Sequence, residues 1–521
     1  MNGLLQDTFT KELPQDPIIE NKRRQVEKAC YSLATPKKTS DPKRIHVATE
    51  MVETLGISKE FSCTPEFLEI VTGNKVIENS KPYAMCYGGH QFGHWAGQLG
   101  DGRAINLGEI VQDNQRWFLQ LKGAGETPYS RTADGLAVLR SSVREYLCSE
   151  AMFYLGVPTT RALSLSLTGD QVLRDMLYDG HQAYEKGAIV CRVAPSFLRF
   201  GSYEIFSARQ DYTTLKTLVN YTLKYCYPHL PENSKASYVQ FYKEVAERTL
   251  NMIIHWQRVG FVHGVMNTDN LSILGLTIDY GPYGWLEGYD PEWTPNTTDR
   301  QHKRYRYGNQ PNIGLWNLYQ LANSLYPLIE DAEPLEEILE AYKTNYSQFY
   351  LEMMMTKVGL FSKNDLDSEL LEALETVLQK TETDMTLFFR LLSKVHKNDT
   401  TALAIEKIKP SFYTPSELKD TILRHWETWF TSYLKRVQSE SLSDAERQEK
   451  MNKVNPKYVL RNYMAQMAID KADEGDYSLI DELYTLLKNP YDEQPSYEKW
   501  FSKRPEWARN KVGCSMLSCS S

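Results

Sequence analysis

The stretch from residue 263 to residue 281 constrains the fold of this chain more than any other. It reads HGVMNTDNLSILGLTIDYG, with Asp269 and Asn270 before an apolar run and Asp279 directly after it. The run at residues 271–278 is typical of a buried strand pair around a tight turn. Such a pair would bring the three polar side chains together at one end of the two strands. Their oxygens are suitable ligands for Mg²⁺ if phosphates complete its coordination shell. The same residue types are common in turns, so the pattern alone fits a plain turn equally well.

A glycine-rich segment, YGGHQFGHWAGQLGDGRAINLGE, lies well before this stretch. Glycines allow a backbone to turn sharply and to come close to a ligand. Gly100, Gly102 and Arg103, followed by apolar residues, predict a hairpin whose tip lies over phosphates. A glycine-rich hairpin without a ligand has the same features, and one G-x-G is a weak signal.

A lysine and a glutamate follow at suggestive places. Residues 117–122 predict a strand that ends at Lys122, and residues 136–155 predict a helix that carries Glu145. A strand lysine held by a helix glutamate is a known way to bind nucleotide phosphates. Both residue types are more commonly solvated surface charges. The helix would bury a stripe formed by Leu139, Val143, Leu147 and Met152.

Two arginines interrupt apolar surroundings further along. Arg192 lies in a predicted strand at residues 188–194, and Arg199 follows in FLRFG. A buried guanidinium needs an anion, which is either a protein carboxylate or a ligand phosphate. Between the lysine and the glutamate, a polar loop carries Asp134 and Gly135, where Asp134 and Arg131 are also compatible with a simple surface pair.

The second half of the chain is predicted to be largely helical. The clearest amphipathic helix covers residues 237–258 and ends at Gly260. A Gly/Pro/Asp-rich segment at residues 281–299 directly follows the D-Y-G sequence and is typical of a substrate-facing loop. Leucine-containing helices are expected at residues 314–329, 334–356, 366–380 and 416–435.

Charge and composition exclude several classes. The net charge of −8 argues against a nucleic-acid-binding protein, which usually presents a basic face. No apolar run approaches the roughly 18 residues needed to span a bilayer. The first twenty residues lack a secretory apolar region and carry four acidic side chains, unlike a transit peptide, so the cytoplasm is expected. The first six cysteines are scattered singly and are expected to be reduced.

In order, these features resemble a protein-kinase series of glycine hairpin, strand lysine, helix glutamate, catalytic loop and D-F-G. His263 and Asn270 have the spacing of the kinase H-R-D-x-x-x-x-N loop, and Asp279-Tyr280-Gly281 stands for D-F-G. Val265 replaces the usual kinase aspartate, and Asp269 lies beside the asparagine instead.

The longer motifs resemble the selenoprotein O family of kinase-like protein adenylyltransferases. The matching stretches are YGGHQFGHWAGQLGDGR, LQLKGAGETPYSR, DGLAVLRSSVREYL, HGVMNTDN, DYGPYGW and YDPEWTPNTTD, within residues 80–300, and weaker similarity covers the rest. The resemblance implies an α+β, bilobal protein-kinase-like fold. Its parts would be an N-terminal arm (1–80), an N-lobe (81–187), a C-lobe with the catalytic loop (188–330) and a helical C-terminal region (331–521).

The resemblance also implies the reaction and its residues. AMP would pass from ATP to a Ser, Thr or Tyr hydroxyl of a protein, with release of pyrophosphate, and ATP would be reversed relative to a kinase. Asp269 would accept the proton, and Asn270 and Asp279 would bind Mg²⁺ or Mn²⁺. The nucleotide would be held by Gly100, Gly102, Arg103, Lys122 (positioned by Glu145), Asp134, Gly135, Arg192, Arg199 and Asp279.

Some alternatives stay open at this point. The missing third-position aspartate also fits a nucleotide-binding pseudokinase scaffold without turnover, and a true protein kinase is the other candidate. Family members with a selenocysteine or cysteine near the C-terminus suggest redox control. Here Cys514 and Cys519 fit a bridge, free thiols or a passive tail. A monomer is favoured, with protein substrates as the expected partners.

Overall fold

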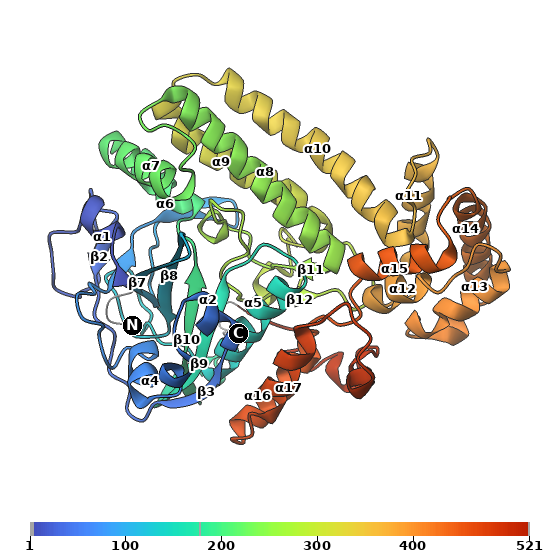
Figure 1. Cartoon of the computed structure of the whole chain (residues 1–521), viewed down its shortest axis with the longest axis horizontal. Helices are drawn as coiled ribbons and strands as arrows, with labels where there is room; N and C mark the ends of the chain where they lie inside the picture. The colour runs from blue at the N-terminus through green and yellow to red at the C-terminus, as the bar shows by residue number, and fades with distance from the viewer. Residues whose placement is uncertain (1–4, 177–178, 519–521) are drawn as a thin grey trace.

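A computed structural model of the chain describes residues 5–176 and 179–518. It has a mixed α and β architecture with one large sheet and many helices (Figure 1). In Figure 1 the strands gather in the blue to green half of the molecule, and long green and yellow helices cross above them.

The large sheet has eight strands, and every neighbouring pair in it is antiparallel. Its order is β2-β4-β7-β8-β10-β9-β3, and β1 pairs with β7 beside this path. The strands are β1 (Leu5–Gln6), β2 (Tyr31–Leu33), β3 (Lys43–Val47), β4 (Tyr83–Met85), β7 (Ala104–Gln112), β8 (Gln115–Lys122), β9 (Arg161–Asp175) and β10 (Gln182–Ala194).

The sheet crosses two of the divisions expected from the sequence. Residues 1–80 were expected to form an arm, but they supply β1, β2 and β3 to the main sheet. The expected boundary between residues 187 and 188 falls inside β10. Short helices α1 to α4 connect the early strands, at Phe9–Glu12, Thr49–Thr54, Lys59–Ser62 and Pro65–Val71.

Helix α5 (Leu139–Tyr154) packs on β9 and β10 and carries the predicted buried stripe. It begins three residues later than predicted. Leu136 and Val138 form isolated bridges with Ala124 and Gly187, which keeps the chain extended up to the first helical residue. Glu145 is buried on the same helix. The sheet and α5 together therefore fix where a strand lysine and a helix glutamate can meet.

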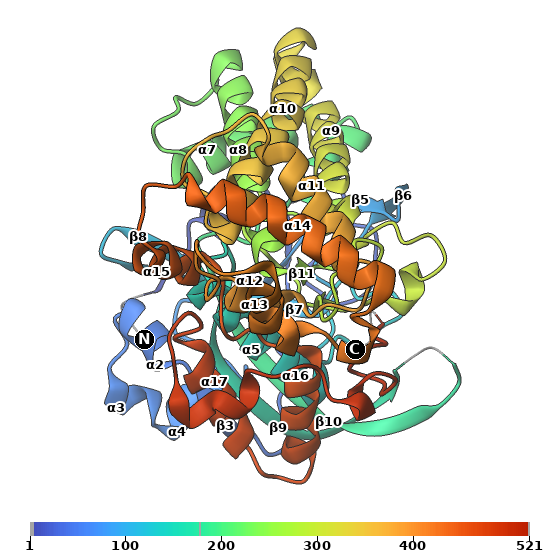
Figure 2. The same cartoon turned by 90° about the vertical axis from the view of Figure 1, so that its right-hand side faces the viewer.

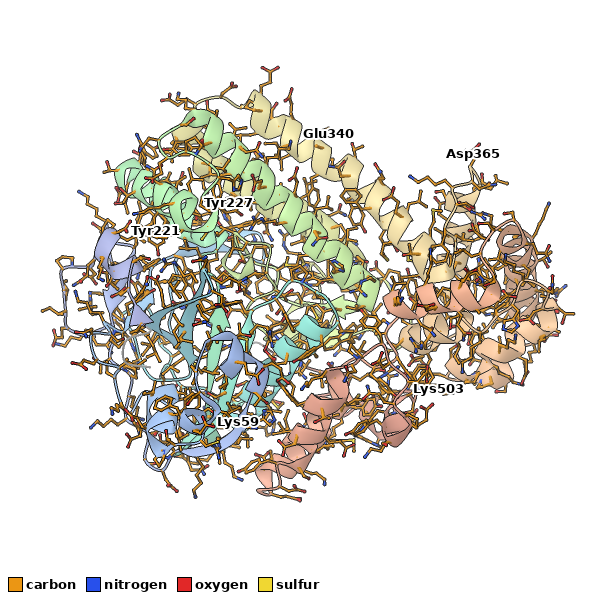
Figure 3. The ribbon with its side chains drawn as sticks, in the orientation of Figure 1. Lys59, Tyr221, Tyr227, Glu340, Asp365 and Lys503 are labelled. Carbon is orange, nitrogen blue, oxygen red and sulfur yellow. The ribbon has the colours of Figure 1, made fainter. Side chains whose placement is uncertain are left out.

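Five longer helices follow the sheet: α6 (Phe200–Ala208), α7 (Tyr212–Cys226), α8 (Lys235–Val259), α9 (Gln310–Ile329) and α10 (Glu333–Val358). The predicted amphipathic helix is α8, and it ends as predicted at Gly260, which has a φ of 74°. Figure 3 shows Tyr221 and Tyr227 at α7. Tyr221 hydrogen-bonds Thr8, just after β1, at 2.9 Å, and Tyr227 donates to the Ile273 carbonyl at 2.5 Å. Helix α7 therefore contacts both the start of the chain and the stretch at residues 263–281.

The segment between α8 and α9 has little regular structure. It contains β11 (Phe261–Val262), β12 (Gly284–Trp285) and the 3-10 turns η1 (Thr268–Asn270), η2 (Thr297–Asp299) and η3 (Tyr307–Asn309). The strand pair predicted at residues 271–278 is reduced to one bridge between Leu271 and Thr277. Gly275 turns the chain at a φ of 63° within a run too short for a ladder. Asp269, Asn270 and Asp279 still line the same cavity, as predicted, although the strands are missing.

The rest of the chain is helical, as predicted, with α11 (Asp367–Leu378), α12 (Met385–Leu392), α13 (Thr401–Ile408), α14 (Asp420–Gln438), α15 (Asp444–Val454), α16 (Asn462–Asp473) and α17 (Ser478–Leu487). Four 3-10 turns, η4 to η7, lie at Lys409–Ser411, Pro415–Glu417, Pro495–Trp500 and Glu506–Ala508. Figure 2 shows α14 lying across α11. Helices α16 and α17 return to pack on α5, so the C-terminal region supports the sheet side as well.

Cysteines in the described part of the chain form no disulfide, and Cys514 is buried. Cys514 is therefore a free thiol, one of the options considered from the sequence, but it is buried rather than exposed on a tail. Cys519 lies outside the described residues. No helix within residues 5–176 and 179–518 combines the length and apolarity required to cross a bilayer.

Lys357 near the end of α10 is buried, with no ion pair in the described part of the chain. Its Nζ donates to the Arg258 carbonyl at 2.7 Å and lies 4.1 Å from the Phe389 ring. Burial and the nearby Arg258 charge lower the pKa of Lys357 well below its ordinary value of 10.5. An ammonium held this way costs stability, because a buried charge needs an opposite charge or several hydrogen bonds.

Lys357→Met should therefore be neutral or stabilising at pH 7, by up to about 2 kcal/mol. The unfolded chain binds the Lys357 proton more tightly than the folded one, so this residue makes the wild type more stable as pH rises toward 10.5. Melting temperatures of both proteins at pH 7 and pH 9 check this. The wild type should gain on the variant at the higher pH, and a parallel response of both would contradict the assignment.

Candidate active site

A cavity of about 670 Å³ lies between the sheet and the segment that follows α8. Most of the predicted site residues line it, namely Gly100, Gly102, Arg103, Lys122, Asp134, Gly135, Arg192, Asp269, Asn270 and Asp279. Glu145 and Arg199 stand behind this wall, and each forms an ion pair with a lining residue. The structure thus brings together all twelve residues predicted from the sequence.

Lys122 and Glu145 meet as the sequence predicted. Lys122 is at the end of β8, and its Nζ lies 2.5 Å from a carboxylate oxygen of Glu145 on α5. Burial lowers the pKa of Lys122, and the neighbouring Glu145 charge opposes that effect. Glu145 therefore fixes the position of the Lys122 ammonium, and Lys122 also lines the cavity.

Arg192 and Arg199 hold Asp279 between them. Their Nη1 atoms donate to different oxygens of its carboxylate, at 2.7 Å from Arg192 and 2.6 Å from Arg199. Arg192 also donates to Glu145 at 3.1 Å, which links this group to Lys122. Burial alone would raise the pKa of Asp279, but Arg199 and Arg192 hold it well below its usual value. Of the two alternatives left open for these arginines, the structure shows a protein carboxylate as their shared anion.

One carboxylate oxygen of Asp269 is buried and has no hydrogen-bond partner among the described residues. Its Oδ2 accepts a hydrogen bond of 3.3 Å from Gln91, while its buried Oδ1 has no hydrogen-bond partner. Burial raises the pKa of Asp269 to about 7, against the opposing effects of Arg199 and Gln91. A buried carboxyl with a raised pKa and a bare oxygen has the properties of a proton acceptor.

The neighbouring Asn270 has its amide fixed. Its Nδ2 donates to the Val265 carbonyl at 2.9 Å, which leaves Oδ1 available. His263 holds the other side of the stretch, because its Nε2 lies 2.9 Å from the Ile278 carbonyl oxygen. That contact places Asp279, the next residue, beside the catalytic loop. Asp279 itself has a φ of 54°, an unusual backbone conformation for a residue other than glycine.

The predicted hairpin tip at residues 100–103 is wrong in detail. The glycine-rich segment forms a separate hairpin of β5 (Gly88–Gln91) and β6 (His94–Gln98), and residues 100–103 are the turn that leads into β7. This turn nevertheless lines the cavity. Gly100 has a φ of 76°, and a Cβ there would lie 2.4 Å from the Tyr129 ring, so only glycine fits.

Asp134 pairs with a residue that the sequence did not suggest. Arg174 of β9 forms two hydrogen bonds of 2.8 Å with its carboxylate, in place of the surface pair with Arg131. Burial would raise the pKa of Asp134, but this pairing holds it below its usual value. A Cβ at the adjacent Gly135 would lie 2.1 Å from the Gly125 carbonyl oxygen, so this bend also requires glycine.

Sequence reasoning missed several residues of the site. Gln91 and Asp101 lie inside the quoted glycine-rich motif, and Asp101 is buried 3.9 Å from Arg199. The Tyr87 ring lies 4.4 Å from the Arg199 guanidinium. Tyr87, Gln91 and Asp101 could have been predicted as site residues, because they lie inside the glycine-rich motif. Arg174 had no such signal, because it lies on a strand 40 residues after its partner.

Comparison with known proteins identifies the family of the chain. A model of the family described as protein adenylyltransferase SelO matches residues 18–488. A protein nucleotidyltransferase YdiU of Flavobacterium johnsoniae is 61% identical over 520 residues, covering 100% of both chains. Proteins of the same description from Rhodopirellula baltica and Aromatoleum aromaticum are 53% and 51% identical, covering 98% and 100% of both chains. The chain therefore belongs to the protein adenylyltransferase SelO family.

Proposed function

We propose that this protein transfers AMP from ATP to the hydroxyl of a Ser, Thr or Tyr residue of another protein and releases pyrophosphate. One observation carries the proposal. Lys122, Arg192 and Asp269 line the same cavity, Arg199 lies directly behind it, and one carboxylate oxygen of Asp269 has no hydrogen-bond partner among the described residues. Membership of an adenylyltransferase family and relatives named as protein nucleotidyltransferases support it.

The site residues have two roles in this reaction: some stabilise charge, and Asp269 transfers a proton. The acceptor oxygen attacks the α-phosphorus, the bond from that phosphorus to the bridging oxygen breaks, and pyrophosphate leaves with the electron pair. Asp269 takes the hydroxyl proton on Oδ1. Lys122, Arg192, Arg199 and Arg103 neutralise the charge that builds on the phosphates, which is the main requirement of phosphoryl-type transfer.

Asn270 and Asp279 fit a divalent ion, Mg²⁺ or Mn²⁺. Asn270 Oδ1 is available, and each oxygen of Asp279 keeps a second lone pair beside its arginine. Within the described residues no group of three or more His, Cys, Asp or Glu forms a complete cage. Two protein ligands are what Mg²⁺ uses when substrate phosphates supply the rest. When bound, the ion would add positive charge at the phosphates.

We also propose that the large sheet with α5 and the segment after α8 belong to the two lobes of a kinase-like fold, divided after β10 rather than between residues 187 and 188, with residues 1–80 as a sheet-bound arm and 331–521 as the helical region. The reversed ATP of this proposal brings its α-phosphate, not its γ-phosphate, to Asp269. The cysteines without disulfides in the described part favour the cytoplasm as the place of action. A monomer and protein partners, without nucleic acid, complete the proposal.

Labelled ATP separates this proposal from its rivals. Protein acceptors in a lysate should gain radioactivity from ATP labelled at the α-phosphate and none from ATP labelled at the γ-phosphate. Label from the γ position alone would make the protein a kinase. ATP binding without any transfer would make it a pseudokinase scaffold, the alternative that Val265 in place of the kinase aspartate favours.

Asp269→Asn keeps the side-chain volume and removes the proton acceptor. We expect kcat to fall about 10²-fold, the lower end for a general base, because positioning and charge contribute most of this type of catalysis. ATP affinity, measured by calorimetry, should stay close to that of the wild type. An unchanged kcat would dismiss the role of Asp269 without dismissing the pocket.

A further inference from the structure

We propose that a basic and aromatic surface beside Asp269 binds the acceptor polypeptide and selects hydroxyl residues that have carboxylate side chains close by in the chain. The inference rests on the proposed function, because it names the class of acceptor that this active site would modify. We name this region the acceptor surface; its residues are Trp95, Arg300, Lys303, Arg304, Trp316 and Tyr319.

The β5–β6 hairpin brings one side of this surface to the catalytic loop. The His90 backbone N–H donates to Thr268 Oγ1 at 2.7 Å, and Gln91 donates to Asp269. A Cβ at Gly89 would lie 3.1 Å from the Cβ of Asp269, so the two backbones are nearly in contact. A polypeptide bound on this hairpin would therefore lie close to Asp269.

From the catalytic loop an aromatic row leads outward. The His90 ring lies 5.2 Å from Trp95 and 5.4 Å from Trp316, and the Arg304 guanidinium lies 4.7 Å from Trp316. Trp95 is 40% exposed, and Tyr319 on α9 is 53% exposed. Figure 2 shows the β5–β6 hairpin at the edge of the molecule beside α9. Exposed aromatic side chains of this kind are typical anchors of protein interfaces.

The adjoining chain is strongly basic. Residues 300–306 read RQHKRYR, so four of these seven side chains are positively charged and none is negative. Arg306 pairs with Glu292 at 2.8 Å. The other three cations of this run form no ion pair with any residue that the structure describes, and Nε of Arg304 is buried without a hydrogen-bond partner. In a chain with a net charge of −8, this run is a local site for anions.

The basic run is fixed relative to the active site. The buried Asp299 accepts the backbone N–H groups of Arg304 at 2.9 Å and Tyr305 at 2.7 Å. The Tyr305 hydroxyl donates to Asn267 at 2.5 Å, two residues before Asp269. Cations held at a constant position near the proton acceptor can define which positions around an acceptor hydroxyl carry carboxylates.

These features identify the partner by its chemistry. Unpaired arginine and lysine side chains match carboxylates, and the exposed aromatic rings match apolar side chains. The nucleotide does not need these cations, since Lys122, Arg192 and Arg103 already line the cavity. The exposed aromatic rings beside these cations favour a polypeptide that also carries apolar side chains, so an acidic polypeptide segment is the occupant that fits.

The test uses two synthetic peptides with the same central Ser, Thr or Tyr, one flanked by glutamates and the other by lysines. The variant Arg300→Glu/Lys303→Glu reverses the charges of the exposed Arg300 and the partly buried Lys303, and it leaves Arg304, which packs on Trp316, unchanged. The matched control, Lys216→Glu/Lys243→Glu, makes the same change in net charge on α7 and α8. Fluorescence anisotropy of the labelled peptides measures binding without any need for AMP transfer.

The wild type should bind the glutamate peptide about 10-fold more tightly than the lysine peptide, with a preference that weakens as salt is added. The Arg300→Glu/Lys303→Glu variant should lose this preference, and the control should keep it. In transfer assays the same variant should raise KM for the glutamate peptide about 10-fold and leave kcat within about 2-fold.

Equal binding of the two peptides by the wild type, or an unchanged preference in the Arg300→Glu/Lys303→Glu variant, would overturn the acceptor surface. ATP binding and transfer from α-labelled ATP to lysate proteins that persist in that case would leave the proposed function intact. Charge-dependent peptide binding without any AMP transfer would support the surface and reject the proposed function, so the two failures are distinguishable.

Discussion

Asp279→Ala should reduce AMP transfer by at least about 10³-fold, the largest effect expected from a single substitution in this protein. The variant loses the carboxylate proposed to hold the divalent ion. It also leaves Arg192 and Arg199, which are buried and bound to Asp279, without their shared counter-charge. Initial rates with α-labelled ATP and an excess of Mg²⁺ or Mn²⁺ measure the loss.

Stability has to be separated from chemistry in this variant, because removing one partner of a buried ion pair costs on the order of 3–5 kcal/mol. Asp279→Asn is the matched control, since it keeps the shape and one oxygen. Melting temperatures with and without ATP show whether phosphates replace the missing carboxylate for the two arginines. A folded Asp279→Ala protein that transfers AMP at more than about a tenth of the wild-type rate would refute the assigned role.

Lys122→Ala should lower kcat by about 10² to 10³-fold, the typical effect of removing one pre-organised donor from developing negative charge. Nζ of Lys122 is held 2.5 Å from Glu145, so it does not need to be reoriented when the nucleotide binds. The kinetic measurement should show a larger change in kcat than in KM for ATP, because the charge on the leaving pyrophosphate grows in the transition state.

Glu145→Gln is the companion to that experiment. It keeps the lysine and removes the anion that anchors both Lys122 and Arg192. We expect a smaller loss than for Lys122→Ala, since both cations remain and only their position is relaxed. A Glu145→Gln protein less active than Lys122→Ala would mean that Glu145 does more than position the lysine.

Local patterns predicted the fold where a segment decides its own structure. The α8 helix has a long apolar stripe and a glycine at its end, and both appear at the predicted positions. The early strands were missed because β1, β2 and β3 are short and gain their stability from pairing with β7, β4 and β9. Strand pairing between distant segments leaves little trace in either sequence.

The same limit applies to the site. Lys122, Glu145 and Asp279 could be found because each lies in a motif whose order along the chain is distinctive. The Arg174 partner of Asp134 and the packing of α16 on α5 depend on contacts between segments far apart, which no spacing encodes. The turn at residues 100–103 was assigned to a hairpin tip because glycine content shows where a chain bends but not in which direction.

The most direct test of the account is a crystal structure with Mg²⁺ and an ATP analogue in which a methylene group replaces the oxygen between the α- and β-phosphates. We expect the triphosphate to contact Lys122, Arg192 and Arg199 and the α-phosphorus to be the one nearest to Asp269, with Asn270 and Asp279 on the ion. A γ-phosphorus nearest to Asp269, or a nucleotide bound away from these residues, would contradict it.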